Sequence, residues 1–187
     1  MTEQSILQAL DSDHAAIAEL LDRLQAAAPG FAEDGRDLRE ELVIEAVRHF
    51  VGEEQYLHPL LRTELPDGAD LAAAGFAANR ATEAVLRRFE QAEQDPAEVL
   101  AELRRLLAEH VAEQQQIFDR LAAAVPAAEL DRLGTEVRGA EQLAPTRPRT
   151  LAASNPALNK FSSFVEGFLD HVRDSYGHRG AREEHVE

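Results

Sequence analysis

Apolar residues recur along the first 125 residues with alternating spacings of three and four, in four separate segments. In the first segment the series consists of Leu7, Leu10, His14, Ile17, Leu21 and Leu24. Such spacing places one stripe of side chains on one face of a helix. The segments are also rich in Ala, Leu, Glu and Arg, which favour helices. The pattern therefore predicts helices over about 5–28, 36–62, 70–93 and 96–124.

Four consecutive amphipathic helices with short connections are typical of an up-down-up-down bundle. We predict an all-α fold in which residues 1–125 form a four-helix bundle. The rest of the chain is divided into a fifth helix over 126–143, a linker over 144–156, a C-terminal helix over 157–176 and a polar tail over 177–187. The apolar stripe of the C-terminal helix is expected to cover a groove of the bundle or to pack against a second copy of the chain in a homodimer.

The chain of 187 residues carries 19 basic and 35 acidic side chains, which gives a formal net charge of −16. Such acidity argues against nucleic acid and anionic membranes as partners, because phosphate groups would be repelled. The sequence has no cysteine, which excludes thiolate metal sites, iron–sulfur clusters and cysteine nucleophiles. No run approaches the roughly 20 apolar residues of a membrane span, and the N-terminus lacks the pattern of a signal peptide. We therefore expect a cytoplasmic protein.

Polar residues interrupt the apolar stripes at positions that belong to the bundle interior. These residues are His14, His49, Glu53, His110 and Gln114. Counted from the loops at one end of the bundle, the three histidines lie at a similar depth, about 20 Å at a rise of 1.5 Å per residue. Imidazole and carboxylate groups that share one layer of a bundle are ligands of iron, manganese or zinc. A hydrogen-bonded network of the same side chains without a metal is the structural alternative.

The order of these residues resembles the bacterial hemerythrin-like proteins of the HHE cation-binding family, with features similar to actinobacterial members. The resemblance covers about residues 1–150 and rests on Asp13-His14, His49-x-x-x-Glu53-Glu54, Leu57-His58-Pro59-Leu60 and Glu109-His110. It implies a four-helix bundle that holds a pair of non-heme iron ions bridged by carboxylates. It also implies a reaction with dioxygen, peroxide or nitric oxide, or a role in sensing iron.

The resemblance places four residues at metal-ligand positions, namely His14, His49, Glu53 and His110. The family usually has a histidine on the third helix, where this chain has Asn79 and Arg80. It also has a glutamate four residues after the last histidine, where this chain has Gln114. A neutral amide cannot bridge two cations as a carboxylate does. One iron, two irons and no metal therefore stay open, and another divalent metal is an alternative to iron.

Further side chains could complete the site. The additional candidate ligands are Gln114, Glu83, Glu113 and His58. His58 lies nine residues after His49, about 180° around an ideal helix, so we expect it to pair with Glu54 or to act at the helix end. The small residues Gly75, Ala78 and Thr82 either leave an open coordination position or a substrate cavity beside the metal, or pack closely against a neighbouring helix.

The sequence supports three functions. The first is a non-heme iron protein that meets dioxygen, peroxide or nitric oxide, including an oxidoreductase that acts on peroxide or on a small-molecule substrate. The second is a metal-free bundle that binds a protein partner, and the third is an iron sensor or store. The sequence lacks the Glu-x-x-His pairs of ferritin-like iron sites, a Gly-rich phosphate loop and a nucleophile elbow.

Overall fold

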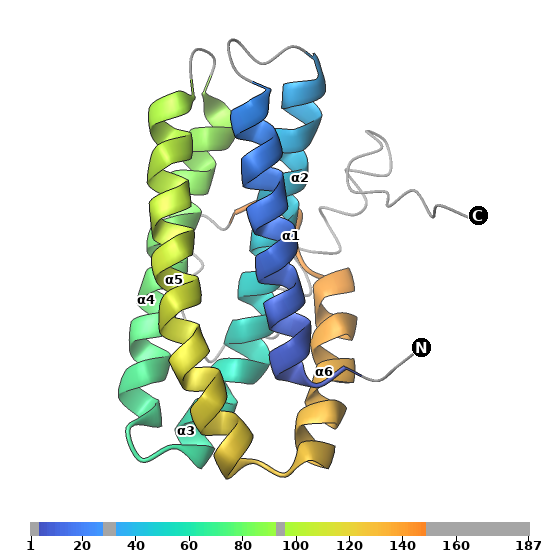
Figure 1. Ribbon diagram of the computed structural model, residues 1–187, viewed down its shortest axis with the longest axis vertical. Coiled ribbons are helices and arrows are strands. Elements are labelled where there is room, and N and C mark those ends of the chain that lie inside the picture. The colour runs from blue at the N-terminus through green and yellow to red at the C-terminus, as the bar shows by residue number, and fades with distance from the viewer. Residues whose placement is uncertain (1–3, 28–32, 93–95, 149–187) are drawn as a thin grey trace, which may run out of the picture.

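The computed structural model describes residues 4–27, 33–92 and 96–148. Its four longest helices are α1 (Ile6–Ala26), α2 (Glu33–Gly52), α4 (Gly68–Gln91) and α5 (Ala97–Ala124). They alternate in direction along the chain as an up-down-up-down bundle (Figure 1). The predicted all-α bundle is confirmed, and the described residues contain no strand.

The bundle core consists of two apolar clusters with a polar layer between them. The first cluster includes the buried residues Ile17, Leu24, Phe50, Phe89 and Leu107. The second cluster includes the buried residues Leu10, Leu57, Leu61, Phe118 and Leu121. Along α1, His14 falls between Leu10 of one cluster and Ile17 of the other, and along α5 His110 falls between Leu107 and Phe118. Apolar packing on both sides therefore fixes the depth of the polar layer.

The predicted second helix contains one turn of π-helix. After α2 the chain continues through η1 (Glu53–Leu57) into α3 (His58–Glu64). A π turn accommodates one more residue than an α turn, so it rotates the following residues by about 100° relative to an ideal α-helix. The π turn therefore changes the face on which His58 lies from that of an ideal helix, and His58 is buried at 3% exposure.

A further helix, α6 (Ala127–Gln142), packs along α1 and α2 on the outside of the bundle (Figure 1). Its apolar face, with Leu130, Leu133 and Val137, joins the second apolar cluster. No helix in the described part of the chain is long and apolar enough to cross a membrane. The predicted C-terminal helix over 157–176, the tail over 177–187 and residues 149–156 of the linker lie outside the described residues.

Helix α6 approaches the start of α1 most closely at Gly134. A Cβ atom added at Gly134 would lie 1.9 Å from the carbonyl oxygen of Gln4, whereas one added at Gly139 would meet nothing within 4 Å. Gly134→Ala is therefore expected to lower the free energy of unfolding by about 1–3 kcal/mol, because α6 must shift away from α1. Gly139→Ala is the matched control in the same helix and should raise it by about 0.5–1 kcal/mol. Urea unfolding measures both, and equal effects would contradict the close approach at Gly134.

Candidate metal centre

Three imidazoles and one carboxylate converge in the polar layer from four helical elements. We call this group, His14 of α1, His49 of α2, Glu53 of η1 and His110 of α5, the ligand cluster. One ligand atom from each member lies within 4.8 Å of the others, and all four side chains are buried. The sequence-based expectation that these side chains meet at a common depth is confirmed.

Distances within the ligand cluster are those between neighbouring ligands of a single cation. The Nε2 atom of His49 lies 3.1 Å from Nε2 of His14 and 3.2 Å from Nε2 of His110. The Oε1 atom of Glu53 lies 3.0 Å from Nε2 of both His49 and His110. Two ligands at about 2.1 Å from a metal and at right angles to each other are separated by roughly 3.0 Å.

Hydrogen bonding alone cannot satisfy this arrangement. A ring nitrogen carries either one hydrogen or one lone pair, yet Nε2 of His49 has three polar atoms within 3.2 Å. A cation at the centre would instead engage one lone pair from each member of the ligand cluster. Three imidazoles with one carboxylate are a donor set suited to a divalent transition metal such as iron, manganese or zinc.

The ligand cluster contains an ionised carboxylate, a protonated imidazole and a neutral imidazole. Burial alone would raise the pKa of Glu53, but attraction to His110 and His49 and the hydrogen bonds from both rings hold that pKa well below its ordinary value. Burial, together with the charge of His49, lowers the pKa of His14 to about 3, so this ring is neutral. Burial alone would lower the pKa of His49, but attraction to Glu53 and hydrogen bonds with Asp13 and Glu53 raise it to about 10. The layer thus stabilises positive charge beside an ionised carboxylate.

Two amide side chains hold Glu53 in place. The Nδ2 atom of Asn79 donates a hydrogen bond of 2.8 Å to Oε2 of Glu53. The Nε2 atom of Gln114 donates to Oε1 of the same carboxylate. Asn79 is completely buried on α4, at the level where the sequence analysis looked for a histidine, but no role was assigned to it there. A polar amide among the buried residues of the third helix was the signal that could have indicated a partner for Glu53.

The other candidate ligands lie outside the ligand cluster. Glu83 is buried on α4, His58 is buried at the start of α3, and Glu113 is exposed on α5. Gln114 contacts Glu53 but is not a member of the cluster. Within the described residues, the four members of the ligand cluster form the one group of histidine and acidic side chains close enough to share an ion.

A second set of polar contacts lies on the Nδ1 side of His49, away from the other members of the ligand cluster. The Oδ2 atom of Asp13 lies 3.6 Å from Nδ1 of His49. Arg138 of α6 donates hydrogen bonds to Oδ1 of Asp13, to Oε2 of Glu141 at 2.7 Å and to the carbonyl oxygen of Ala9 at 2.7 Å. The sequence analysis assigned no function to α6, because the contacts of Arg138 with Asp13 and Ala9 join residues more than 100 positions apart and leave no mark on local periodicity.

Glu141 makes the free energy of unfolding depend on pH. Burial, together with the charge of Asp13, raises the pKa of Glu141 from 4.5 to about 7. Between these values the folded state binds more protons than the unfolded state, so the free energy of unfolding falls as the pH rises from 4.5 to 7. Glutamine at position 141 does not titrate, so the free energy of unfolding of Glu141→Gln should not fall over this range. Relative to the unmodified protein, the variant should therefore be more stable at pH 8 than at pH 5, by about 1–3 kcal/mol. Urea unfolding of both proteins at equal metal content measures the difference, and a pH-independent difference would contradict the raised pKa.

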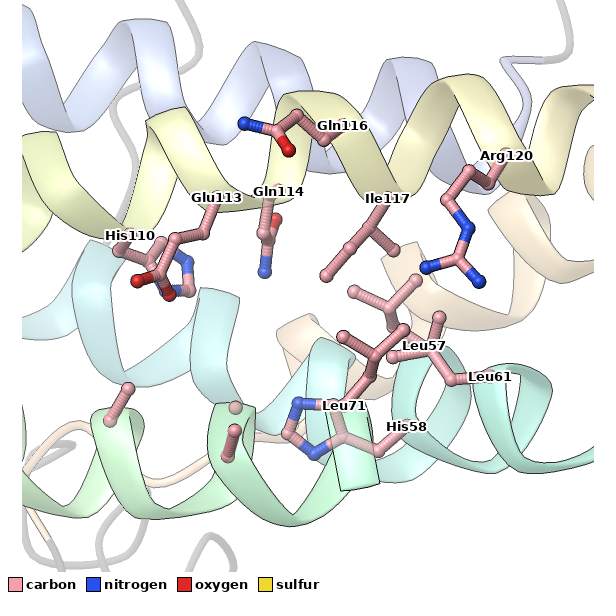
Figure 2. A pocket seen from close by; sticks show the side chains of 13 residues that line it. Leu57, His58, Leu61, Leu71, His110, Glu113, Gln114, Gln116, Ile117 and Arg120 are labelled. Atoms are coloured by element: carbon pink, nitrogen blue, oxygen red, sulfur yellow. The ribbon is translucent and has the colours of Figure 1, made fainter. Parts of the chain in front are cut away.

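A cavity of about 340 Å³ lies between α3, α4 and α5, directly beside the ligand cluster. His110 and Gln114 line it on the side of the metal centre, and His58 lies across from Gln114 (Figure 2). Of the small residues for which the sequence left a space or close packing open, Gly75 and Ala78 line this cavity and Thr82 does not. Gly75 also packs closely against His58. The architecture therefore places an open space next to one of the candidate ligands.

Comparison with known families agrees with this geometry. The family model described as hemerythrin HHE cation binding domain matches residues 5–122. Searches of curated proteins and of solved structures gave no match for the chain. Since the family match covers more than half of the sequence and contains all four members of the ligand cluster, the chain belongs to the hemerythrin HHE cation-binding family.

Proposed function

We propose that this protein is a non-heme iron protein that binds one iron ion through His14, His49, Glu53 and His110. The observation that carries the proposal is the convergence of three imidazoles and Glu53, with four of the distances between ligand atoms at 3.0–3.2 Å and all of them within 4.8 Å. Membership of a cation-binding family supports a metal at this place. When bound, iron supplies one-electron chemistry toward dioxygen, peroxide or nitric oxide.

The proposal of one iron ion, rather than two, rests on Asn79 and Gln114. Both amides direct an N–H group toward Glu53, so each stabilises the carboxylate of the existing cluster. A primary amide has no negative charge and cannot bridge two cations as a carboxylate does. Glu53 would then be the one carboxylate available, which matches the charge requirement of a single divalent ion better than that of a pair.

The protein residues around the iron would fix the orientation of the ligands and limit the access of water to the site. The raised pKa of His49 keeps a second proton on this ring, and that proton would leave Nε2 when a metal binds there. Asp13, which faces Nδ1, would hold the remaining proton there. Asn79 and Gln114 fix the orientation of Glu53. The apolar clusters on both sides of the layer restrict water. Since a cavity opens beside His110, we favour an oxidoreductase acting on peroxide or dioxygen over an iron store.

Elemental analysis of the full chain, purified after growth with added iron, tests this proposal. We expect about one iron per chain, by the ligand count of the cluster. Two irons per chain would overturn the single-ion site, and no metal would favour a metal-free bundle that binds a partner. The iron-loaded protein should also change its near-ultraviolet absorption when peroxide is added. An unchanged spectrum with iron bound would overturn the oxidoreductase role and favour sensing or storage.

A further inference from the structure

We propose that the cavity between α3, α4 and α5 binds a small neutral alcohol, an alkylphenol or a molecule of similar shape, with its hydroxyl group between His58 and Gln114. The assignment names a ligand class for the space beside the metal centre. Binding to the cavity does not require the metal, but the interpretation of the ligand as a substrate rests on the proposed function. The inference stands on the cavity, two buried polar side chains that line it, and the distribution of apolar residues around it.

The first observation is a pair of buried polar groups whose hydrogen-bonding capacity is incomplete. His58 is 3% exposed and Gln114 is 5% exposed, and both line the cavity. Within the described residues, Nδ1 of His58 and Oε1 of Gln114 have no hydrogen-bond partner. A buried acceptor without a donor costs about 1–3 kcal/mol. Both of these atoms are themselves closed off from the cavity, and Figure 2 shows the amide nitrogen of Gln114 on the side that faces His58. A ligand hydroxyl could therefore accept from the amide N–H of Gln114 and donate to Nε2 of His58.

The second observation is the shape of the cavity. Its volume of about 340 Å³ lies at the small end of the range for pockets that bind organic molecules. Gly75 allows His58 its present position at this cavity, since a Cβ atom there would lie 2.8 Å from Nε2 of His58. A larger residue at position 75 would therefore push the imidazole out of its present place. Ala74 and Ala78 continue the same wall of small side chains along α4.

The third observation is the separation of polar and apolar parts. Leu57, Leu61, Leu71 and Ile117 gather toward the end of the cavity where Arg120 lies, whereas His110, Glu113 and Gln114 lie toward the other end (Figure 2). A ligand with one polar group and an alkyl tail would match this division. Glu113, Gln116 and Arg120 are exposed and form the mouth.

Charge favours a neutral ligand. Burial lowers the pKa of His58, so its ring is neutral and offers one N–H donor and one lone pair. Arg120 at the mouth is paired with Asp67 by two hydrogen bonds. Glu113 at the mouth and the net charge of −16 oppose a carboxylate ligand. A neutral hydroxyl avoids both the desolvation of a charge and this repulsion.

Titration of the iron-loaded full chain with 4-propylphenol, followed by NMR, tests the assignment. We expect saturable binding that is at least about tenfold tighter than that of 4-propylanisole, which lacks the donor hydrogen, or of 4-propylbenzoate, which is charged. His58→Leu should remove the preference for the phenol over the anisole without removing the anisole signal. Equal binding of the phenol and the anisole by the unmodified protein, or tighter binding of the benzoate, would overturn the proposed ligand class.

Ala78→Leu provides the test of location, with Ala77→Leu as its matched control. Ala78 lines the cavity, whereas Ala77 is exposed one residue earlier on the same helix. We expect Ala78→Leu to weaken 4-propylphenol binding at least about tenfold by filling the space, and Ala77→Leu to change it less than about twofold. Equal binding by both variants would overturn the location. Iron content measured on the same samples separates this outcome from a failure of the metal centre, because neither position belongs to the ligand cluster.

Discussion

Replacing His49 with alanine is expected to lower the iron content of the purified protein at least about fivefold. His49 is the central member of the ligand cluster, since its Nε2 atom lies within 3.2 Å of His14, His110 and Glu53. Its loss removes one of three imidazoles and leaves Glu53 with fewer groups to balance its buried charge. Elemental analysis after growth with added iron measures the effect, and His110→Ala should give a loss of similar size.

His58→Ala is the control for this experiment. His58 is buried like His49, at 3% exposure against 1%, but it lies outside the ligand cluster. A loss of iron that followed from a general weakening of the core should therefore appear in both variants, whereas a loss of a ligand should appear in His49→Ala alone. Equal iron loss in the two would mean that the cluster does not hold the metal. Circular dichroism of each variant confirms that the comparison is between folded proteins.

The bundle could be predicted because it follows from the spacing of apolar residues within each helix. The alternation of three and four residues places Leu10, His14 and Ile17 on one face of α1, and all three are buried. The depth of the histidines followed from the constant rise of the α-helix, since short loops bring equal residue counts to equal heights. The same reasoning placed Glu53 beside His49. Periodicity and chain length therefore sufficed for the four members of the ligand cluster.

The π turn at Glu53–Leu57 could not be predicted in this way. The sequence around it continues to favour helix, and an additional residue in one turn changes the facing of later residues without ending the helix. An ideal helix therefore does not give the facing of His58, although its expected place outside the ligand set agrees with the structure. The structure places it at the cavity, where the close approach of Gly75 leaves room for the ring.

The polar groups behind the ligand cluster were missed for a different reason. The contacts of Asn79 with Glu53 and of Arg138 with Asp13 join helices that are distant in the sequence. A single buried amide or an arginine on an outer helix carries no signal until its partner is known. The family match ends at residue 122, before α6, so Arg138 and Glu141 lie outside the matched region.

Asp13→Asn is expected to weaken metal binding about 10- to 100-fold, although Asp13 is not a member of the ligand cluster. A metal-bound imidazole carries its proton on the other ring nitrogen, which for His49 is Nδ1 facing Asp13. The carboxylate stabilises that proton and makes Nε2 a stronger donor. Asparagine keeps the shape of the side chain but removes the negative charge, and Arg138 then loses one of its two acidic partners.

Asp11→Asn is the matched control, because Asp11 lies on the same helix, is exposed and accepts a hydrogen bond from Gln115 instead. Competition with a chelator under anaerobic conditions measures the affinity for ferrous iron in both variants. We expect Asp11→Asn to stay within about twofold of the unmodified protein, since a surface charge at this distance is screened by salt. Equal losses would show that Asp13 acts through the overall charge of α1. A loss confined to Asp13→Asn means that the Asp13 carboxylate acts on the ligand cluster through His49. Since Arg138 of α6 pairs with this carboxylate, removing the Arg138 guanidinium should weaken the same affinity if α6 takes part.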